Sequence, residues 1–402
     1  MVSNFRLLTM LKLCASMLMF AMASYASAQS AVTFQGNPAH TGVTSLTTPL
    51  KAPMYPAWKV TLPAEVSYPL IANGMVYVVY SNSGSTYGSN LIALDLVTGA
   101  TVWGPVAIAG TYFSSYPAYD NGTLYVVNFD GLLRTYNATT GAPGWTLQLP
   151  TQYAFSAPPT ATGGVVYISG SGSGGTLYAV GESSHAVLWS KPTVTGDDSS
   201  PAVGNGDVYV SYACVWVYSF LASNGFPLWH NSTGCSGGGG TTPVLSNGKL
   251  YARDTGNSAT AGYVFNAAAG GAAVGHFDAM TIPAIDTTLG YFLQTGSVLR
   301  AISLNDLTTV AWSFSGDGYL ATSPLVVDNL VYIGSTQGQL YGLDKATGAV
   351  IWQTKLHAMY NTEYGRMWPS MAAGGGTLVV PAQNVLYGFN ADHLFKDGFE
   401  GP

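Results

Sequence analysis

The stretch LYGLDKATGAVIW at residues 340–352 recurs in closely similar form as LIALDLVTGATVW at residues 91–103. Each copy contains a short apolar run, a turn sequence ending in Thr-Gly, and a tryptophan four residues after the glycine. A unit that recurs at a fixed step indicates a repeat architecture, in which neighbouring copies bury each other's apolar faces. The number and spacing of the copies therefore decide the fold.

Tryptophan marks one position of the repeat along most of the chain. It occurs at Trp58, Trp103, Trp145, Trp189, Trp229, Trp312 and Trp352. The intervals are 40–45 residues, except for the 83 residues between the fifth and sixth tryptophans, which contain two copies. A proline opens each copy, at Pro69, Pro117, Pro159, Pro201, Pro243, Pro283, Pro324 and Pro369. The two markers agree on eight copies, of which the fifth lacks its tryptophan.

Each copy predicts four short strands. After the proline, a turn leads into a run of β-branched and aromatic residues, as in NGMVYVVY (73–80). A second run follows, as in LIALDL (91–96), and the tryptophan lies on the last strand. Four strands in about 42 residues, without helical periodicity, are typical of a propeller blade. The expected fold is all-β, an eight-bladed β-propeller of four-stranded antiparallel blades.

The two ends of the repeat region complement each other. The last copy supplies the runs 377–382 and 385–390 and then ends without a tryptophan strand. The first tryptophan, Trp58, precedes the first complete copy. We therefore expect the Trp58 strand to complete the eighth blade, so that N- and C-terminal strands share one sheet and close the ring.

The turn before each tryptophan predicts a left-handed backbone conformation. Glycine stands four residues before the tryptophan in four copies, at Gly99, Gly141, Gly225 and Gly348. Glycine takes a positive φ without steric cost. His185 in the third copy and Thr308 in the sixth stand in that place, so different turns are expected there. We expect each tryptophan ring to pack against the next blade.

Three segments are expected along the chain. Residues 1–28 have the basic start, apolar run and Ala-Ser-Ala ending of a signal peptide, so export to the periplasm or the medium is predicted. Residues 29–392 form the propeller, and residues 393–402 form a C-terminal tail that contains LFKDGFEGP. After the signal peptide, no run reaches the ~18 apolar residues of a membrane helix.

The charge of the chain limits its partners. Only 8% of residues are charged, 13 are basic, and the net charge is −6. Nucleic-acid binding needs a basic patch, so nucleic acid is not expected as a partner. The expected partner is a protein, peptide or saccharide, and the chain is expected to be a monomer.

The phrases LDLVTGATVW, LDKATGAVIW and YNATTGAPGW resemble the repeat of pyrroloquinoline quinone (PQQ)-type β-propellers. The segment FQGNPAHTG at 34–42 is similar to the lead-in that such exported propellers carry. The resemblance implies the propeller fold. It leaves two kinds of function open, because one fold carries many activities.

One branch of the resembling family consists of quinoprotein dehydrogenases, which oxidise alcohols or sugars with PQQ and calcium at the propeller axis. The other branch binds no cofactor and includes the propeller subunit of the outer-membrane β-barrel assembly machinery. This chain resembles the second branch in size, but it lacks the acylation cysteine of the assembly lipoprotein. No catalytic, cofactor-binding or metal-binding residue is carried over, and no cofactor is expected.

Two cysteines follow the signal peptide, Cys214 and Cys235. Cys214 lies in the loop after the second strand of the fourth copy, and Cys235 lies in the crossing to the fifth. In a four-stranded blade these two kinds of loop emerge on the same face. We expect a disulfide between them, because export places the pair in an oxidising compartment.

Aromatic residues gather in several crossings between copies, on this same face. They are Tyr112, Phe113, Tyr116, Tyr153, Phe155, Tyr319, Tyr360, Tyr364 and Trp368, together with Arg366. They are the candidate binding funnel for a partner. The alternative is that these rings only pack the central channel and the loop bases.

Carboxylates in the crossings suggest a second, weaker possibility. Asp197, Asp198, Asp317 and Glu363 carry oxygen atoms of the kind that calcium prefers. The favoured interpretation is that they are solvated turn residues. Histidines such as His40, His185, His230 and His276 show no metal-ligand spacing, so structural roles are expected for them.

The function expected from these observations is a non-enzymatic binding or scaffolding module that is exported and meets its partner on the crossing-loop face. The alternative is a small PQQ- and calcium-dependent dehydrogenase with a carboxylate as its base.

Overall fold

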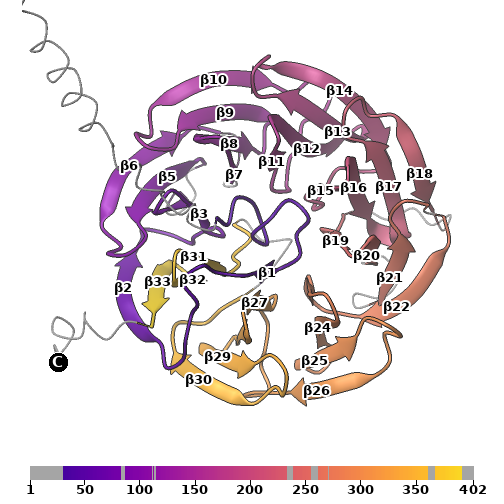
Figure 1. Ribbon diagram of the computed structural model, residues 1–402. Coiled ribbons are helices and arrows are strands. Elements are labelled where there is room, and N and C mark those ends of the chain that lie inside the picture. The colour runs from indigo at the N-terminus through magenta and orange to yellow at the C-terminus, as the bar shows by residue number, and fades with distance from the viewer. Residues whose placement is uncertain are drawn as a thin grey trace, which may run out of the picture.

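The computed structural model describes residues 30–82, 87–110, 112, 115–232, 239–254, 261–269, 271–360 and 367–391. The strands form eight sheets arranged as blades around a common axis (Figure 1). Seven sheets have four strands, and the eighth gains a fifth, β1 (Val43–Thr44). The predicted all-β, eight-bladed propeller is confirmed.

The first four blades follow one another along the chain. Blade 1 consists of β3 (Leu70–Ala72), β4 (Met75–Ser81), β5 (Ser89–Asp95) and β6 (Thr101–Ile108). Blade 2 consists of β7 (Ser115–Asp120), β8 (Thr123–Asn128), β9 (Leu132–Asn137) and β10 (Pro143–Gln148). Blade 3 consists of β11 (Thr160–Thr162), β12 (Val165–Gly172), β13 (Gly174–Gly181) and β14 (Ala186–Thr193). Blade 4 consists of β15 (Ala202–Gly204), β16 (Asp207–Tyr212), β17 (Trp216–Leu221) and β18 (Pro227–Asn231), with the short 3-10 turn η1 (Ala213–Val215) between β16 and β17.

The remaining blades complete the ring. Blade 5 consists of β19 (Val244–Ser246), β20 (Lys249–Arg253), β21 (Ala261–Asn266) and β22 (Ala273–Asp278). Blade 6 consists of β23 (Ala284–Ile285), β24 (Leu289–Gln294), β25 (Val298–Ser303) and β26 (Val310–Phe314). Blade 7 consists of β27 (Leu325–Val327), β28 (Leu330–Gly334), β29 (Gln339–Asp344) and β30 (Val350–Lys355). Blade 8 consists of β31 (Ala372–Gly374), β32 (Thr377–Ala382), β33 (Val385–Asn390) and β2 (Tyr55–Thr61).

The ring closes as expected, because β2 pairs with β33 as the outer strand of blade 8. Trp58 lies opposite Gly388 and Val60 opposite Leu386 in an antiparallel register. Strands from the two ends of the repeat region therefore lie side by side at the ring's seam (Figure 1). No open sheet edge is left between the first and last copies.

The turn that opens each tryptophan strand is built by side-chain hydrogen bonds. In blade 7, the Asp344 carboxylate accepts from the main-chain N–H of Ala346 at 3.1 Å and of Thr347 at 2.8 Å. The Thr347 hydroxyl donates to the same oxygen at 2.8 Å. These bonds lower the pKa of Asp344. The Asp-x-x-Thr-Gly pattern is thus an Asx turn that ends in a left-handed glycine.

The glycine of that turn has a second reason to be glycine. Gly348 has φ +72°, and a Cβ on it would lie 2.6 Å from the Trp312 ring of the preceding blade. Gly99 stands over Trp58 in the same way, at 2.7 Å. The Trp312 indole N–H donates to the carbonyl of Lys345 at 3.0 Å. Each such turn therefore seats one tryptophan, which joins two neighbouring blades.

Two contacts between neighbouring blades are built differently, the one between blades 2 and 3 and the one between blades 5 and 6. In blade 3, His185 itself takes φ 53°, and its ring stacks on Trp145 at 4.7 Å. In blade 6, Leu307 rather than Thr308 takes the positive φ, at 58°. Blade 5 has Gly275 in the tryptophan position, and the Leu307 side chain fills the space above it. A residue of the next blade thus compensates for the missing ring.

The lead-in enters the ring, which the repeat pattern does not predict. Residues 31–44 are here called the axis segment. They form hydrogen bonds with blades 1 to 7 in turn, at residues in or next to the innermost strand of each blade. The partners are Ile71, Tyr119, Pro159, Val203, Leu245, Ile285 and Val326. Figure 1 shows this indigo segment across the centre of the ring. A closed ring of short inner strands leaves a central channel, and here the chain itself enters it.

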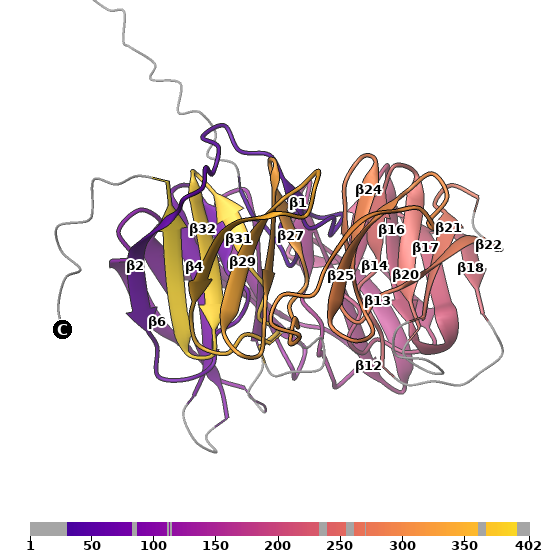
Figure 2. The same cartoon turned by 90° about the horizontal axis from the view of Figure 1, so that it is seen from below.

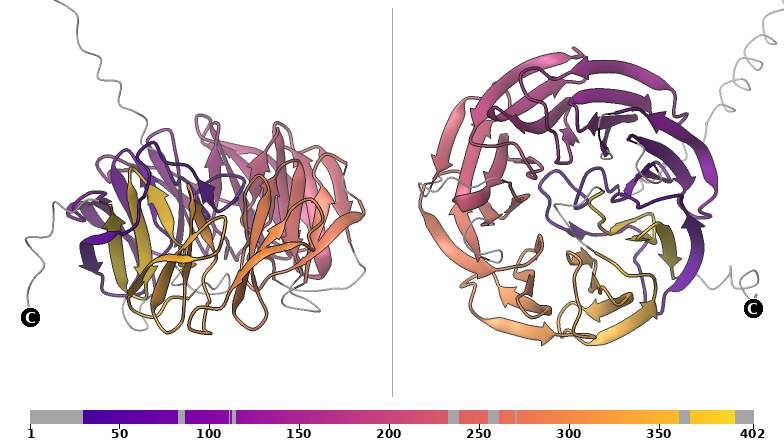
Figure 3. Two further views of the ribbon diagram at one scale, coloured as in Figure 1. Left: turned by 60° about the horizontal axis from the view of Figure 1, so that its bottom comes forward. Right: turned by 180° about the vertical axis from the view of Figure 1, so that it is seen from behind.

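The two faces of the disc carry different loops (Figures 2 and 3). The crossing-loop face carries the connections between blades and the turns after each second strand. These two kinds of loop pair with each other, as in the bridges Ala154–Ser171 and Leu320–Ser335. The opposite face, here called the turn face, carries the remaining turns of each blade.

Candidate functional site

The axis is filled by buried side chains of the axis segment. Phe34 has no exposed surface, and its ring lies 5.2 Å from that of Tyr68 and 5.0 Å from that of Trp368. His40 is also fully buried. Phe34 belongs to the largest apolar cluster of the described residues, which spans several blades. The axis segment is therefore part of the core.

His40 is a titratable group at the centre of the ring. Burial lowers its pKa to about 4, against the opposing effect of hydrogen bonds to two main-chain carbonyls. The carbonyl of Phe34 lies 2.7 Å from Nδ1, and that of Pro201 lies 3.0 Å from Nε2. The Thr160 hydroxyl is 3.4 Å from Nε2. The neutral ring is thus held between the lead-in and blades 3 and 4.

This burial predicts a pH dependence of stability. The unfolded chain protonates His40 near pH 6.5 and the folded chain only near pH 4, so the unfolded state binds the extra proton between them. Stability is therefore lost as pH falls from 6.5 to 4, by up to about 3 kcal/mol. In urea unfolding, the stability difference between wild type and His40→Gln should shrink over this range. A difference that is constant from pH 7 to pH 4 would contradict the burial of a neutral imidazole.

The proposed funnel divides into exposed and buried rings. Tyr112, Tyr153, Tyr319 and Tyr360 are 39–68% exposed in four crossings. Tyr116, Phe155 and Trp368 are at most 1% exposed and pack in the core, so they support the loops and do not face solvent. Phe113, Tyr364 and Arg366 lie outside the described residues. The binding funnel stays a prediction, which now depends on the four exposed tyrosines.

Two further rings join Tyr112 on this face. Its ring lies 4.6 Å from Phe129 and 6.2 Å from Tyr87, which is 55% exposed. Tyr87 and Phe129 come from turns after second strands, whereas the candidates predicted from the sequence come from crossings between copies. They belong to the same face because these turns and the crossings emerge together.

The carboxylates considered for calcium are engaged by their own loops. Asp197 accepts hydrogen bonds from Ser171 and, at 3.4 Å, from Ser156. Burial, and then the charge of Asp197, raises the pKa of Asp198 to about 7. Asp317 accepts from the Ser335 hydroxyl at 2.7 Å. Glu363 lies outside the described residues.

These contacts hold the connections between blades against the ends of the second strands. Within the described part of the chain, no three His, Cys, Asp or Glu side chains gather as a metal site would require.

The cysteine pair is described only in part. Cys214 is buried in the turn η1, with φ 63°, and its N–H donates to the Asp254 carboxylate at 2.9 Å. The neighbouring Ala213 N–H donates to the carbonyl of Gly239, so this turn lies against the crossing that contains Cys235. Cys235 itself is outside the described residues, and the disulfide stays a prediction.

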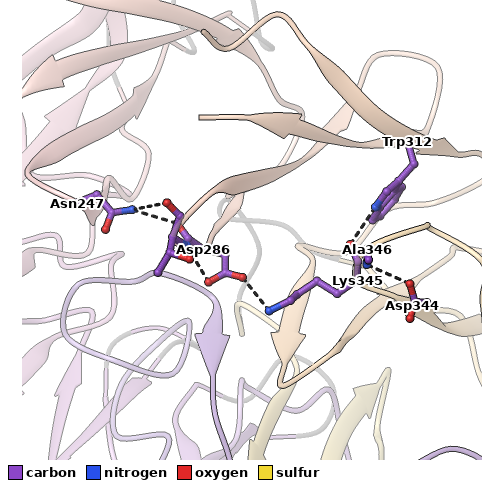
Figure 4. A network of polar contacts seen from close by, with 7 residues as sticks. Asn247, Asp286, Trp312, Asp344, Lys345 and Ala346 are labelled. Atoms are coloured by element: carbon purple, nitrogen blue, oxygen red, sulfur yellow. Dashed lines mark hydrogen bonds and ion pairs between the residues drawn. The ribbon is translucent and has the colours of Figure 1, made fainter. Parts of the chain in front are cut away.

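The turn face carries a polar network between blades 5, 6 and 7 (Figure 4). Asn247 donates to the carbonyl of Asp286 at 3.1 Å, and Lys345 forms an ion pair with the Asp286 carboxylate at 3.0 Å. A pocket of about 480 Å³ lies beside them. The paired groups are partly exposed, so the ion pair contributes at most about 1 kcal/mol. We interpret the network as a latch between blades.

The axis does not fit a quinone cofactor. PQQ would need an open space with polar ligands at the centre of the ring. Phe34, His40 and Trp368 are buried there, and the axis segment is hydrogen-bonded to seven blades, to six through its main chain and to blade 3 through the Thr33 hydroxyl.

The fold and the axis define an all-β propeller with a self-filled centre and an aromatic loop face. Residues 88–270 and 173–386 match the family model described as outer membrane protein assembly factor BamB. Together these matches cover more than half of the chain, and the chain therefore belongs to this family of PQQ-like propellers.

The curated relatives include a quinone-dependent dehydrogenase and an outer-membrane assembly factor. The chain is 29% identical over 197 residues to the dehydrogenase subunit of the quinone alcohol dehydrogenase of Gluconobacter oxydans. This match covers 43% of the chain and 24% of the relative. It is 29% identical over 96 residues to the outer membrane protein assembly factor BamB of Escherichia coli, covering 21% of the chain and 24% of the relative. Each match thus spans about a quarter of the curated relative.

Among solved structures, BamB from Moraxella catarrhalis superposes with a TM-score of 0.63. The match covers 85% of this chain and 99% of that one, at 17% identity, and it supports the fold alone. In the described residues no helix is long and apolar enough to cross a membrane.

Proposed function

We propose that this chain is an exported, non-enzymatic propeller that binds a protein or peptide partner on its crossing-loop face. The observation that carries the proposal is the set of exposed tyrosines, Tyr112, Tyr153, Tyr319 and Tyr360, on a face that a rigid ring supports. Large exposed rings on rigid loops bury much area at low entropic cost, which is typical of binding surfaces. The family membership adds support, because its model is described as an assembly factor.

The location in the cell envelope is part of the same proposal. It rests on the signal-peptide pattern of residues 1–28, which lie outside the described residues, and on relatives named for outer-membrane assembly. The ring is complete within one copy, because β2 closes blade 8, so no partner copy is needed to form the propeller itself.

Substitution of all four exposed tyrosines by alanine should weaken capture of the partner by about 100-fold or more, because such rings are frequent hot spots. The measurement is quantitative mass spectrometry of proteins retained from an envelope extract by immobilised wild type and variant. A matched control replaces Val97, Val102, Val274 and Val310, exposed apolar residues away from the crossings, with alanine. Equal retention by all three proteins would contradict a binding role for this face.

The alternative function is a quinoprotein dehydrogenase, which the Gluconobacter relative supports. The buried side chains that fill the axis argue against a dehydrogenase, because they occupy the place of its cofactor. Incubating the pure protein with PQQ and calcium separates the two functions, since stoichiometric uptake of the chromophore with dye reduction would replace the binding proposal.

A further inference from the structure

Blade 4 carries an unusual row of rings on its third strand. Trp216, Tyr218 and Phe220 alternate along β17 and so face the same side, toward blade 3. The rings of Trp216 and Tyr218 are 6.3 Å apart with 15° between their planes, and those of Tyr218 and Phe220 are 6.0 Å apart with 5°. The corresponding positions of the other seven third strands carry at most two aromatic residues.

This row borders a groove at the outer rim, between β14 of blade 3 and β18 of blade 4. The groove has a volume of about 260 Å³, and its lining includes Lys191, Pro192, Tyr218, Phe220, Leu228 and His230. Figure 1 shows β14 and β18 next to each other on the rim. The groove therefore lies on the outer rim, away from the axis.

The polar groups of the groove favour an acidic ligand. Lys191 is a cation, and none of the lining residues is acidic, although the whole chain has a net charge of −6. The Tyr218 hydroxyl accepts the main-chain N–H of Val194 at 3.1 Å, which leaves its own proton to donate. His230 lies opposite Tyr218 on β18, with the two rings 6.0 Å apart. Carboxylates would complement these groups.

The backbone beside the groove favours an extended peptide. β18 is the outermost strand of its sheet, so one edge of its main chain pairs with no other strand of blade 4. Peptides in extended form add to such edges, while neighbouring pockets take their side chains. An aromatic pocket with a cation beside a strand edge thus suits a peptide that has aromatic and acidic residues close together.

We propose that this groove binds the C-terminal segment of a second copy of the chain, residues 392–402. That segment contains Phe395 and Phe399 close to Asp397 and Glu400, which matches the lining in both ring content and charge. The last described residues continue β33 in blade 8, on the opposite side of the ring from the groove (Figure 1). Eleven residues extend at most about 40 Å. Because β33 ends on the far side of the ring from this groove, we assign the occupant to a neighbouring copy.

The binding test uses the full chain and a fluorescein-labelled peptide of residues 392–402. Saturable binding by fluorescence anisotropy is expected, weakened at least tenfold by Lys191→Glu and by Tyr218→Ala. Rising salt should also weaken it, because added ions screen the attraction between Lys191 and the carboxylates of the peptide. The matched control is Tyr263→Ala, the equivalent position in blade 5, which also faces a histidine, His276.

Several outcomes would overturn the proposal. They are the absence of saturable binding, equal weakening by Tyr263→Ala, or binding of an acidic oligosaccharide but not of the peptide. If Tyr218→Ala does not fold, Lys191→Glu at the rim decides the result. Sedimentation over a range of concentrations should show association that Phe399→Ala abolishes. If the protein stays monomeric while its groove is occupied, the segment binds within its own chain. That result would overturn the assignment to a second copy.

Discussion

Replacing Phe34 with alanine is expected to lower the free energy of unfolding by about 3–5 kcal/mol, the range for a fully buried phenylalanine. Phe34 lies outside the repeats, yet its ring contacts Tyr68 of the first crossing and Trp368 of the last. Its removal would leave a cavity where the blades converge. Rigid inner strands limit how far the cavity can collapse, so the loss should lie in the upper part of the range.

The measurement is guanidinium unfolding followed by tryptophan fluorescence. Tyr153→Ala, a change at a ring that is 68% exposed, is the control and should alter stability by less than about 0.5 kcal/mol. A Phe34→Ala protein within 1 kcal/mol of wild type would show that the axis segment is not part of the core.

Replacing Trp58 with alanine is expected to cost a similar amount, about 3–5 kcal/mol, and to act at the seam of the ring. Trp58 is 4% exposed, and its indole N–H donates to the carbonyl of Leu96 in blade 1 at 2.9 Å. Its strand, β2, pairs with β33 without a connecting turn. Loss of the ring should therefore also loosen the β2–β33 pairing.

Hydrogen exchange distinguishes a loss of global stability from a local loosening of the β2–β33 pairing. Trp103 makes the same contact between blades 1 and 2, where its N–H donates to the carbonyl of Ala138 at 2.9 Å. Trp103→Ala should lower global stability to a similar extent but leave the amides of β2 and β33 protected. If both variants expose those amides equally, the seam is no weaker than any other blade contact.

The candidate binding face shows what sequence reasoning could and could not reach. Tyr153 and Phe155 are two residues apart in one crossing, and the sequence predicts the same role for both. Tyr153 is 68% exposed, whereas Phe155 is fully buried and fits against Gly131 and Gly170, which have no side chains to exclude it. Gly131 lies in the turn between β8 and β9, and Gly170 lies in β12 of the next blade, so only the folded chain shows that they make room for one ring.

The filled axis is the larger difference between expectation and structure. The segment FQGNPAHTG has no strand periodicity, and its resemblance to a lead-in did not show where it lies. Its hydrogen bonds go to partners as distant as Val326, which bonds to Gly42, and those partners form one surface only after the ring has closed. Loss of the fifth tryptophan was visible in the sequence, but its replacement by Leu307 of the next blade was not.

The sequence by itself determined the number of blades, the order of strands within each blade, and the shared eighth blade. These features depend on local periodicity and on turn chemistry such as Asp-x-x-Thr-Gly, which act over a few residues and repeat. Only the tertiary structure decided which aromatic rings face solvent, what fills the axis, and where an aromatic groove opens at the rim. Those features depend on the packing of residues from different copies, and such long-range contacts leave no periodic trace in the chain.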